Sequence, residues 1–409
     1  MFAGVSGLRS HQIMMDVVGN NIANVNTVGF KSSRVTFADA LSQLVRGSSG
    51  GTGEATVGMN PHQVGLGVRV ASTDLVFTQG GSQLTGKSTD VSIQGEGFFV
   101  VRFGSEQLYT RAGAFSFDQN GNLTDPSGAA VQGWLAALDG TISSNAPVQD
   151  IKIPVGQTIE PTATTAVRIG GNVSAGAETT DDAVITAIDI VDNVGDTHRM
   201  TFELVKTGDN AWEMTVQDPD GNDIGTTALT FDPDNGQLSA PTTPPSFTFT
   251  PPGGSAVDFT VDFGTPGAAG SLTQFGGSSD AAALGQDGST SGYLRAFAIG
   301  DDGVLSGVFS NGRSRPLARL AVANFNNPSG LVKAGDSRFR STTTSGAALV
   351  GESGSAGRGG ISAGTLEMSN VELAQEFTNL IIAQRGFQAN SRIITSSDEM
   401  LQDLVNLKR

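Results

Sequence analysis

The sequence predicts an α+β multidomain chain. A mostly β body, with β-rich domains of which one is inserted in another, lies between N- and C-terminal helices that pair as a coiled-coil-like inner domain. Two observations support this prediction. Large apolar residues recur at every seventh position at both ends of the 409-residue chain, which is a helical spacing. The sequence between the ends holds nearly all of the 55 glycines, which favours strands and tight turns.

Composition limits the classes of function that the chain can have. The net charge is −16, and residues 151–290 carry 19 acidic side chains against 4 basic ones. This acidic block indicates a separate, solvated domain and argues against nucleic-acid binding, which needs a basic face. The absence of cysteine excludes disulfides and thiolate metal sites. We also expect no membrane span and no cleaved secretory signal, because no run approaches about 18 apolar residues and the start of the chain lacks a basic segment followed by an apolar one.

The first helix is expected from about Gly4 to Ile22. It should end in the polar stretch that follows, because asparagine side chains compete for backbone hydrogen bonds. Its seven-residue apolar row consists of Met1, Leu8, Met15 and Ile22. A second helix is predicted over Phe37–Arg46, ending at Gly47. The glycine-, serine- and threonine-rich segment Gly47–Gly58 is expected to be mobile unless a neighbour orders it.

From Val68 onward the apolar period changes to two, which indicates strands. Asn-Gly and Asp-Gly pairs separate the apolar runs and predict two-residue hairpin turns, because such turns need positive φ angles. These pairs are Asn120–Gly121, Asp220–Gly221, Asn235–Gly236, Asp302–Gly303 and Asn311–Gly312. The prolines between Pro241 and Pro252 restrict any strand there to a sheet edge.

The same patterns predict a division into four parts. A helical inner domain holds residues 1–28 and 365–409, and a linking segment holds residues 29–70 and 342–364. A β-rich middle domain holds residues 71–150 and 286–341, and an acidic β-rich domain of residues 151–285 is inserted in it. Thr342–Gly364 is interpreted as a linker because it is rich in glycine, serine and alanine. The sequence leaves open whether the acidic block is one domain or two.

The long C-terminal helix is expected from about residue 370, with Ser369 and Glu372 as a capping box and with Lys408 and Arg409 as favourable charges at its end. Its first apolar row consists of Leu366, Leu373, Leu380, Phe387, Ile394 and Leu401. A second row, at eleven-residue spacing, consists of Val371, Ile382, Ile393 and Leu404. Two separated stripes predict neighbours on two sides, as in a tube wall or a multi-helix bundle. The alternative is that both stripes face the chain's own domain.

No arrangement of side chains predicts an enzyme, a metal site or a bound cofactor. The three histidines, His11, His62 and His198, do not lie at ligand spacing. The sequence Gly47–Gly51 matches a nucleophile elbow literally but lacks the flanking strand and helix that expose the serine. Asp218–Leu229 begins like a calcium loop but lacks the turn glycine and the bidentate glutamate.

Both ends of the chain resemble those of the bacterial flagellar rod and hook proteins. The similar stretches are Met1–Gly7 and Asn20–Lys31 at the start, Val371–Phe377, Gln384–Ser391 and Asp398–Leu401 at the end, and Gly95–Val101 with Tyr109–Gly113 in the first β-domain. The resemblance covers the two ends and the first β-domain, and hardly reaches the acidic block.

The resemblance implies a structural subunit of the flagellar hook. Such subunits self-assemble into a tubular helical polymer that acts as a flexible universal joint and transmits torque from rod to filament. It implies unfolded export through the flagellar type III channel to an extracellular hook. The implied partners are other copies of the chain, the distal rod protein, the hook–filament junction protein, the hook cap and the hook-length control protein.

Two alternatives stay open beside the hook subunit. A distal rod protein would share both ends, but the long acidic insertion favours the hook because rod subunits of this family are shorter. A secreted acidic β-rich binding module or adhesin, with helical ends for dimerisation, is an alternative of another class.

We therefore expect two sets of functional residues. The apolar rows on both helices form the assembly interface, and both helices are expected to be disordered in the free monomer, where they lack partners. The resemblance implies that the segment after the first helix bridges neighbouring subunits through Asn24, Asn26, Gly29 and Phe30.

Overall fold

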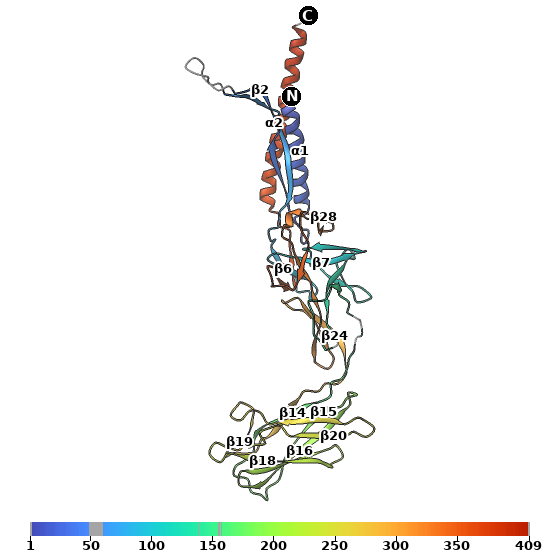
Figure 1. The fold of residues 1–409 in the computed structure, drawn as a ribbon, viewed down its shortest axis with the longest axis vertical. Helices are drawn as coiled ribbons and strands as arrows, with labels where there is room; N and C mark the ends of the chain where they lie inside the picture. Colours follow the sequence, from blue (N-terminus) through green and yellow to red (C-terminus); the bar gives the residue numbers. More distant parts are fainter. Residues whose placement is uncertain (1, 49–59, 138, 154–155, 157, 408–409) are drawn as a thin grey trace. The chain divides into compact units, whose positions relative to one another are not determined.

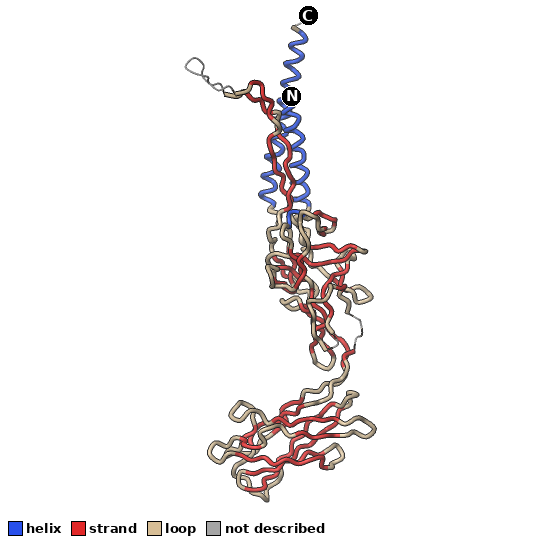
Figure 2. The backbone as a smooth tube through the Cα atoms, in the orientation of Figure 1, coloured by secondary structure: helices blue, strands red, loops and turns tan. Residues whose placement is uncertain are grey.

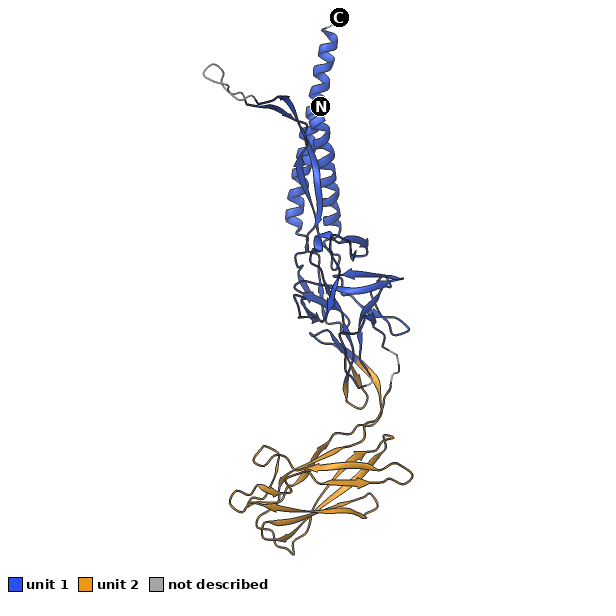
Figure 3. Cartoon of the chain, in the orientation of Figure 1, with its two compact units in different colours: residues 1–154, 297–306, 315–409 blue, residues 155–296, 307–314 orange. Residues whose placement is uncertain are grey.

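The computed structural model describes residues 2–48, 60–137, 139–153, 156 and 158–407. The chain forms two compact units (Figure 3). Unit 1 comprises Met1–Pro154, Phe297–Ser306 and Arg315–Arg409, and unit 2 comprises Val155–Ala296 and Gly307–Ser314. The finer division into four parts stays a prediction. Most of Gly47–Gly58 lies outside the described residues, as do Met1, Lys408 and Arg409.

The predicted terminal helices are present and pack against each other. Helix α1 spans Phe2–Ala23 and helix α2 spans Leu373–Asn406. Figure 2 shows them side by side, far from each other in sequence but together in unit 1. They run antiparallel, because Gly4 of α1 faces Ile394 of α2 while Asn21 of α1 bonds to Glu376 near the start of α2.

The predicted start of the second helix is wrong. Leu366 belongs to strand β32 (Thr365–Glu367), which pairs with β5 (Ser82–Leu84), so it cannot continue the helical row. Glu372 is itself the N-cap residue, with an extended backbone and no side-chain cap hydrogen bond. The Ser369 hydroxyl instead accepts a hydrogen bond from the Val371 N–H at 3.3 Å. The helix therefore begins at Leu373, and strand pairing uses Leu366, which the apolar row assigned to the helix.

The predicted helix over Phe37–Arg46 is also wrong, because two strands occupy this segment. Strand β1 (Ser33–Asp39) pairs with β4 (Val68–Leu75), and β2 (Ser42–Arg46) pairs with β3 (His62–Gly65). Both partners lie beyond the glycine-rich segment, so a local pattern could not reveal the pairing. Strands β1 and β4 pack along α1, where the ring of Phe37 lies 5.9 Å from that of His11.

The β body of unit 1 is built on a sheet in which β26, β11, β7, β8, β29 and β28 are successive neighbours. Its core holds Phe98 together with Tyr109, Trp134, Phe325 and Phe339. The elements are β6 (Val91–Gln94), β7 (Phe98–Phe103), β8 (Glu106–Thr110), β9 (Ser116–Phe117), β10 (Leu123–Thr124), β11 (Ala130–Leu135), β12 (Gln149–Asp150), β26 (Ser314–Leu320), β27 (Val322–Asn324), η1 (Pro328–Gly330), β28 (Val332–Gly335) and β29 (Arg338–Arg340).

The segment Thr342–Gly364 is not a simple linker. Strand β30 (Leu349–Gly351) pairs with β27, and β31 (Gly360–Ala363) pairs with β6. The side chain of Ile361 is 4% exposed, so the segment contributes to the β body despite its composition. A glycine-rich composition marks turns as well as linkers, and here it marks the turns between short strands.

The Asn-Gly and Asp-Gly pairs lie at hairpin turns, as predicted, but the turns are longer than two residues. At Asn120–Gly121 only the glycine has a positive φ, of 80°. Gly121 N–H donates to Asp118 O, and Asp118 N–H donates to Asn122 O. This is a type I turn followed by a left-handed glycine, which spaces the strands by three residues. The Asp220–Gly221, Asp302–Gly303 and Asn311–Gly312 turns follow the same hydrogen-bond pattern.

Unit 2 contains two sheets. One is the antiparallel sheet β15–β16–β17–β18–β19, and the other has the order β20–β21–β14–β22 with β23 also paired to β14. The proline-flanked strand β20 lies at an edge, as predicted. The strands of these two sheets are β14 (Ala166–Asn172), β15 (Val184–Val191), β16 (Thr197–Gly208), β17 (Ala211–Gln217), β18 (Asp223–Phe231), β19 (Leu238–Ala240), β20 (Ser246–Phe249), β21 (Val257–Asp262), β22 (Leu272–Thr273) and β23 (Ala282–Gln286). Strands β24 (Gly292–Ile299) and β25 (Val304–Phe309) belong partly to each unit. Strand β13 (Thr158–Ile159) belongs to neither of the two sheets and pairs with β24.

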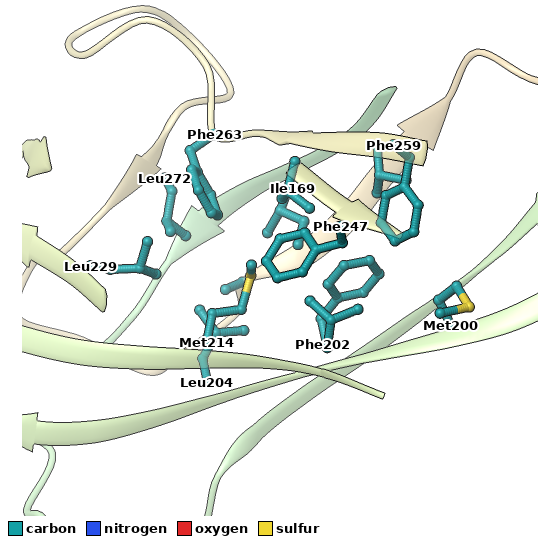
Figure 4. Packing of buried hydrophobic residues seen from close by; sticks show 14 of the residues in the cluster. Ile169, Met200, Phe202, Leu204, Met214, Leu229, Phe247, Phe259, Phe263 and Leu272 are labelled. Atoms are coloured by element: carbon teal, nitrogen blue, oxygen red, sulfur yellow. The ribbon is translucent and has the colours of Figure 1, made fainter. Parts of the chain in front are cut away.

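The core of unit 2 is closed by side chains from both of its sheets. Phe202 and Met214 from the first sheet and Ile169 and Phe259 from the second are at most 1% exposed and belong to one cluster. Figure 4 shows these side chains pointing toward one another between the sheets. Unit 2 is therefore a β-sandwich that buries its apolar residues within itself.

Candidate assembly interface at the paired terminal helices

The first predicted apolar row lies beside the contact between the two helices. Leu8, Met15 and Ile22 of α1 are half-buried. So are Leu380, Phe387 and Ile394 of α2, whereas Leu373 and Leu401 are 41% and 48% exposed. Part of this row therefore already has a partner within the same chain.

The second predicted row is mostly uncovered. Ile382, Ile393 and Leu404 are 54%, 51% and 63% exposed, and Val371 precedes the helix. Only one residue of α2, Ala383, is buried. The helix pair thus leaves a long apolar surface on α2 open to solvent among the described residues.

Small residues, which the sequence analysis did not select, set the closest approach of the two helices. A Cβ atom built on Gly7 would lie 2.7 Å from the side-chain amide of Asn390, and one on Gly386 would lie 2.5 Å from the ring of His11. Ser10 is 4% exposed. A glycine inside a helix lowers helix stability by about 1 kcal/mol relative to alanine. Its presence there therefore suggests close packing of a neighbour, and this is the signal in the sequence that points to Gly7 and Gly386.

Asn21 ties the end of α1 to both of its neighbours. Its Nδ2 donates to the Ser33 carbonyl at 2.8 Å and to Glu376 Oε1 at 3.2 Å, and its Oδ1 accepts from the Ser33 N–H at 3.0 Å. Burial raises the pKa of the Glu376 carboxyl above its ordinary value, and the hydrogen bond from Asn21 offsets this only in part. Asn21 therefore holds the start of the following strand, at Ser33, beside Glu376 of α2.

A buried ionic cluster joins three distant segments just below the helices. Lys31 Nζ donates to Glu367 Oε1 at 2.6 Å and to the Thr78 carbonyl at 2.7 Å. Arg111 Nη1 donates to Glu367 Oε2 at 3.2 Å. The side chains of Lys31, Glu367 and Arg111 are 0%, 1% and 3% exposed. The segment after α1, the β body and the strand before α2 are thus held together at one point.

Desolvation dominates the electrostatics of this cluster. Burial lowers the pKa of the Lys31 ammonium and of the Arg111 guanidinium, while the charge of Glu367 acts in the opposite direction on both. A buried ion pair of this kind contributes little net stability, but losing one partner leaves an uncompensated charge. Glu367 is not among the residues predicted from the sequence. Its only signal there is that it is a single charged residue between the apolar residues Leu366 and Met368.

The predicted bridging residues divide between the interior and the surface of the chain. Gly29 has a φ of 66°, and a side chain there would collide with the backbone of Ala112. Phe30 is 8% exposed and lies 4.5 Å below the ammonium of Lys333. Asn24 bonds back to the Asn20 carbonyl, while Asn26 is exposed. Contact of this segment with a neighbouring subunit stays a prediction.

The described residues do not assemble a catalytic or metal centre. They hold no group of three or more histidine, cysteine, aspartate or glutamate side chains placed to bind a metal. In the loop that begins like a calcium site, Asp218 Oδ1 accepts from the N–H groups of Asp220 and Asn222, so the carboxylate stabilises the turn. Neither helix in the described part is long and apolar enough to cross a membrane.

Comparison with known proteins matches both ends and both units. Family models match in order along the chain: "Flagella basal body rod protein" over residues 1–31, "Flagellar hook protein FlgE/F/G D1 domain" over 92–175, "Flagellar basal body protein FlaE D2 domain" over 174–289 and "Flagellar basal body rod FlgEFG protein C-terminal" over 362–407.

Similar proteins match over their whole length. The chain is 41% identical over 440 residues to the flagellar hook protein FlgE of Borreliella burgdorferi, covering 100% of this chain and 99% of that protein. It is 40% identical over 460 residues to FlgE of Treponema pallidum, with the same coverage. The crystal structure of the Helicobacter pylori hook protein FlgE2 has a TM-score of 0.51 and 16% identity, and the match covers 71% of this chain and 99% of that one. That last likeness concerns the fold alone.

Proposed function

The chain belongs to the family of flagellar hook proteins FlgE, and on this premise we propose that its copies assemble through the paired terminal helices into the tubular wall of a bacterial hook. The family is one of structural subunits and not of enzymes. In this proposal α1 and α2 form the inner wall of the tube and line its channel. The β body and unit 2 lie outside.

The exposed apolar surface of α2 is the observation that supports this proposal most strongly. Phe377, Ile381, Ile382 and Ile393 are each at least half exposed along one helix. A helix that is apolar beyond its one contact face needs further neighbours, because a contiguous exposed apolar stripe is rare on soluble monomers. Other copies of the same helix pair supply such neighbours in a tube.

The outer parts of the chain suit weaker contacts. Residues 151–290 carry 19 acidic and 4 basic side chains, so copies of this block repel one another. Contacts between these surfaces would slide as the tube bends, while the helical wall keeps its packing, and the polymer would act as a universal joint. Repulsion of this kind is screened by salt, so the bending stiffness of tubes should depend on ionic strength.

The resemblance to hook proteins supports further assignments. Export would take place through the flagellar type III channel, and the assembled hook would be extracellular. Its partners would be the distal rod protein at one end and the hook–filament junction protein at the other, with the hook cap and the hook-length control protein acting during assembly. A secreted adhesin is disfavoured, because the matches to flagellar hook proteins run over the whole chain. A distal rod protein is disfavoured because the identity to a hook protein reaches 41%, against 29% to a flagellar basal-body rod protein that also matches over the whole chain.

Electron microscopy of the purified protein under polymerising conditions tests this function. We expect tubes from the wild type and none from Ile382→Asp, because the new charge would be buried in every subunit contact. Ile382 points away from the protein core, so its variant should keep the fold of the monomer. Gln384→Asp is the matched control, an exposed polar position on the same helix that should still give tubes.

A stop at a small oligomer at high concentration would contradict the polymer and favour the adhesin. Normal tubes from Ile382→Asp would contradict the assignment of this helix face to a subunit contact.

A further inference from the structure

An apolar groove lies on the side of α1 that faces away from α2. Its volume is about 720 Å³, and its wall is formed by α1 and by the start of β4 with the residues before it. Phe2, Val5, Ile13 and Leu66 supply apolar surface, and Arg9 and Arg69 supply charge. Phe2 and Val5 are 84% and 52% exposed, and the groove lining includes no acidic side chain.

The two arginines of the groove are available for a partner. Both are exposed, and among the described residues neither forms an ion pair with a carboxylate. The groove therefore has an apolar floor and two positive charges without a counter-charge. An apolar segment that carries carboxylates would be complementary to it.

The end of α2 has this composition and lacks a partner in its own chain. Figure 1 shows α2 continuing past the N-terminal end of α1. We call Ser397–Asn406 the α2 overhang, because α2 already passes Gly4 of α1 at Ile394. Its Met400, Leu404 and Val405 are 63%, 63% and 70% exposed.

The charge of the overhang is opposite to that of the groove. Asp398, Glu399 and Asp403 lie within it, and no basic residue occurs from Ser397 to Leu407. The basic pair Lys408–Arg409 follows outside the described residues. The overhang extends about 15 Å and the groove follows about 18 Å of α1, from Phe2 to Ile13, at a rise of about 1.5 Å per residue.

We propose that the α2 overhang of one copy binds in the groove beside α1 of a second copy. This proposal rests on the proposed function and specifies one of its contacts. The overhang cannot reach the groove of its own chain, because α2 is one continuous helix that packs on the opposite side of α1 and leads away from it. The contact would link subunits through apolar burial, with two arginines facing carboxylates at its rim.

Charge exchange tests the electrostatic half of this contact. Arg9→Glu with Arg69→Glu should raise the critical concentration for tube formation by about tenfold or more, because attraction becomes repulsion at every contact. Asp398→Arg with Asp403→Arg should have the same effect. The chain that carries all four substitutions should polymerise like the wild type. Failure of the combined variant while both double variants remain folded by circular dichroism would contradict the pairing.

Cysteine cross-linking tests which copy fills the groove, and the absence of natural cysteines gives a clean background. Tubes would be grown from a mixture of Val5→Cys and Leu404→Cys chains and then oxidised. We expect a disulfide-linked heterodimer on a non-reducing gel. The control mixture replaces Val5→Cys with Asn20→Cys, an exposed position on the same helix but beyond the groove, and should give little heterodimer.

The outcomes separate the two proposals. Tubes without the Val5–Leu404 cross-link would overturn the docking and leave the proposed function intact. So would cross-linking of Val5→Cys to a cysteine placed in residues 49–59 of its own chain, which would mean that the chain fills its own groove. If the wild type forms no tubes, the proposed function is wrong and the docking is wrong with it.

Discussion

Unit 2 and the terminal helices differ in how far they bury their apolar residues. In unit 2, Phe202, Leu204 and Met214 are completely buried between two sheets. In α2, whose length is 34 residues, Ala383 alone is buried. Unit 2 therefore has the core of an independent domain, and the helix pair resembles a piece of a larger core. The difference indicates that burial for the helices is completed between copies.

The largest effect is expected at the buried ionic cluster that joins the segments beside the helices to the β body of unit 1. Glu367→Ala should lower the free energy of unfolding of unit 1 by about 3–5 kcal/mol, because Lys31 and Arg111 would be left buried without a counter-charge. Denaturant unfolding followed by circular dichroism measures this. Glu106→Ala is the control, since it breaks the exposed ion pair with Arg340 and should have little effect. Equal effects of both substitutions would contradict the role assigned to the buried cluster.

The next prediction compares the two regions directly. Phe202→Ala should destabilise unit 2 by about 3–5 kcal/mol, because it leaves a cavity in a closed core. Ile382→Ala should change the stability of the monomer by no more than about 0.5 kcal/mol, because the side chain is already half exposed.

The two substitutions should have the opposite order of effect on polymerisation. Ile382→Ala should raise the critical concentration for tube formation, and Phe202→Ala should leave it nearly unchanged at temperatures where unit 2 remains folded. A large loss of monomer stability in Ile382→Ala would show that α2 belongs to a core within its own chain.

Sequence periodicity located both helices, the alternating strands and the turns, because each of these is a local pattern. It failed where a distant segment decided the outcome. Phe37–Arg46 forms strands since its partners lie beyond a glycine-rich segment, and Thr342–Gly364 joins the β body through strands β27 and β6.

The candidate site shows the same limit. Apolar rows identified which residues lie on the helix surface, but the closest contact runs through Gly7, Gly386 and Asn390, where small size matters more than hydrophobicity. The buried ionic cluster of Lys31, Arg111 and Glu367 joins residues far apart in the sequence, so no local sequence pattern could predict it.

A smaller effect should distinguish the contact face of α1 from its free face. Gly7→Ala should weaken helix pairing by about 1 kcal/mol or more, because the new Cβ would crowd the Asn390 side chain. Gly19→Ala should stabilise the helix by about 0.5–1 kcal/mol, because nothing lies within 4 Å of the new Cβ. Thermal unfolding measured at 222 nm compares the two. Stabilisation by Gly7→Ala would mean that the helices do not pack closely at this position.

The smallest effect concerns pH. Because the folded-state pKa of Glu376 is raised by burial, folding takes up a proton. Protonation of Glu376 therefore stabilises the folded state at low pH. This stabilisation is lost as the pH rises from the ordinary glutamate pKa through the raised pKa of Glu376. Glu376→Gln should remove this loss, so its Tm should fall less than that of the wild type between acidic and neutral pH. The control is Glu399→Gln, at an exposed position on α2, whose Tm should change with pH as that of the wild type does. If the Tm of Glu376→Gln also changed with pH as that of the wild type does, burial of Glu376 would be unimportant.

Hydrogen exchange of the monomer and of the assembled tube tests the central claim most directly. Residues 395–406 of α2, beyond the contact with α1, should exchange quickly in the dilute monomer and become protected in the tube, whereas the strands of unit 2 should be equally protected in both states. Full protection of α2 in the dilute monomer would contradict the account, because the helices would then be complete within a single chain.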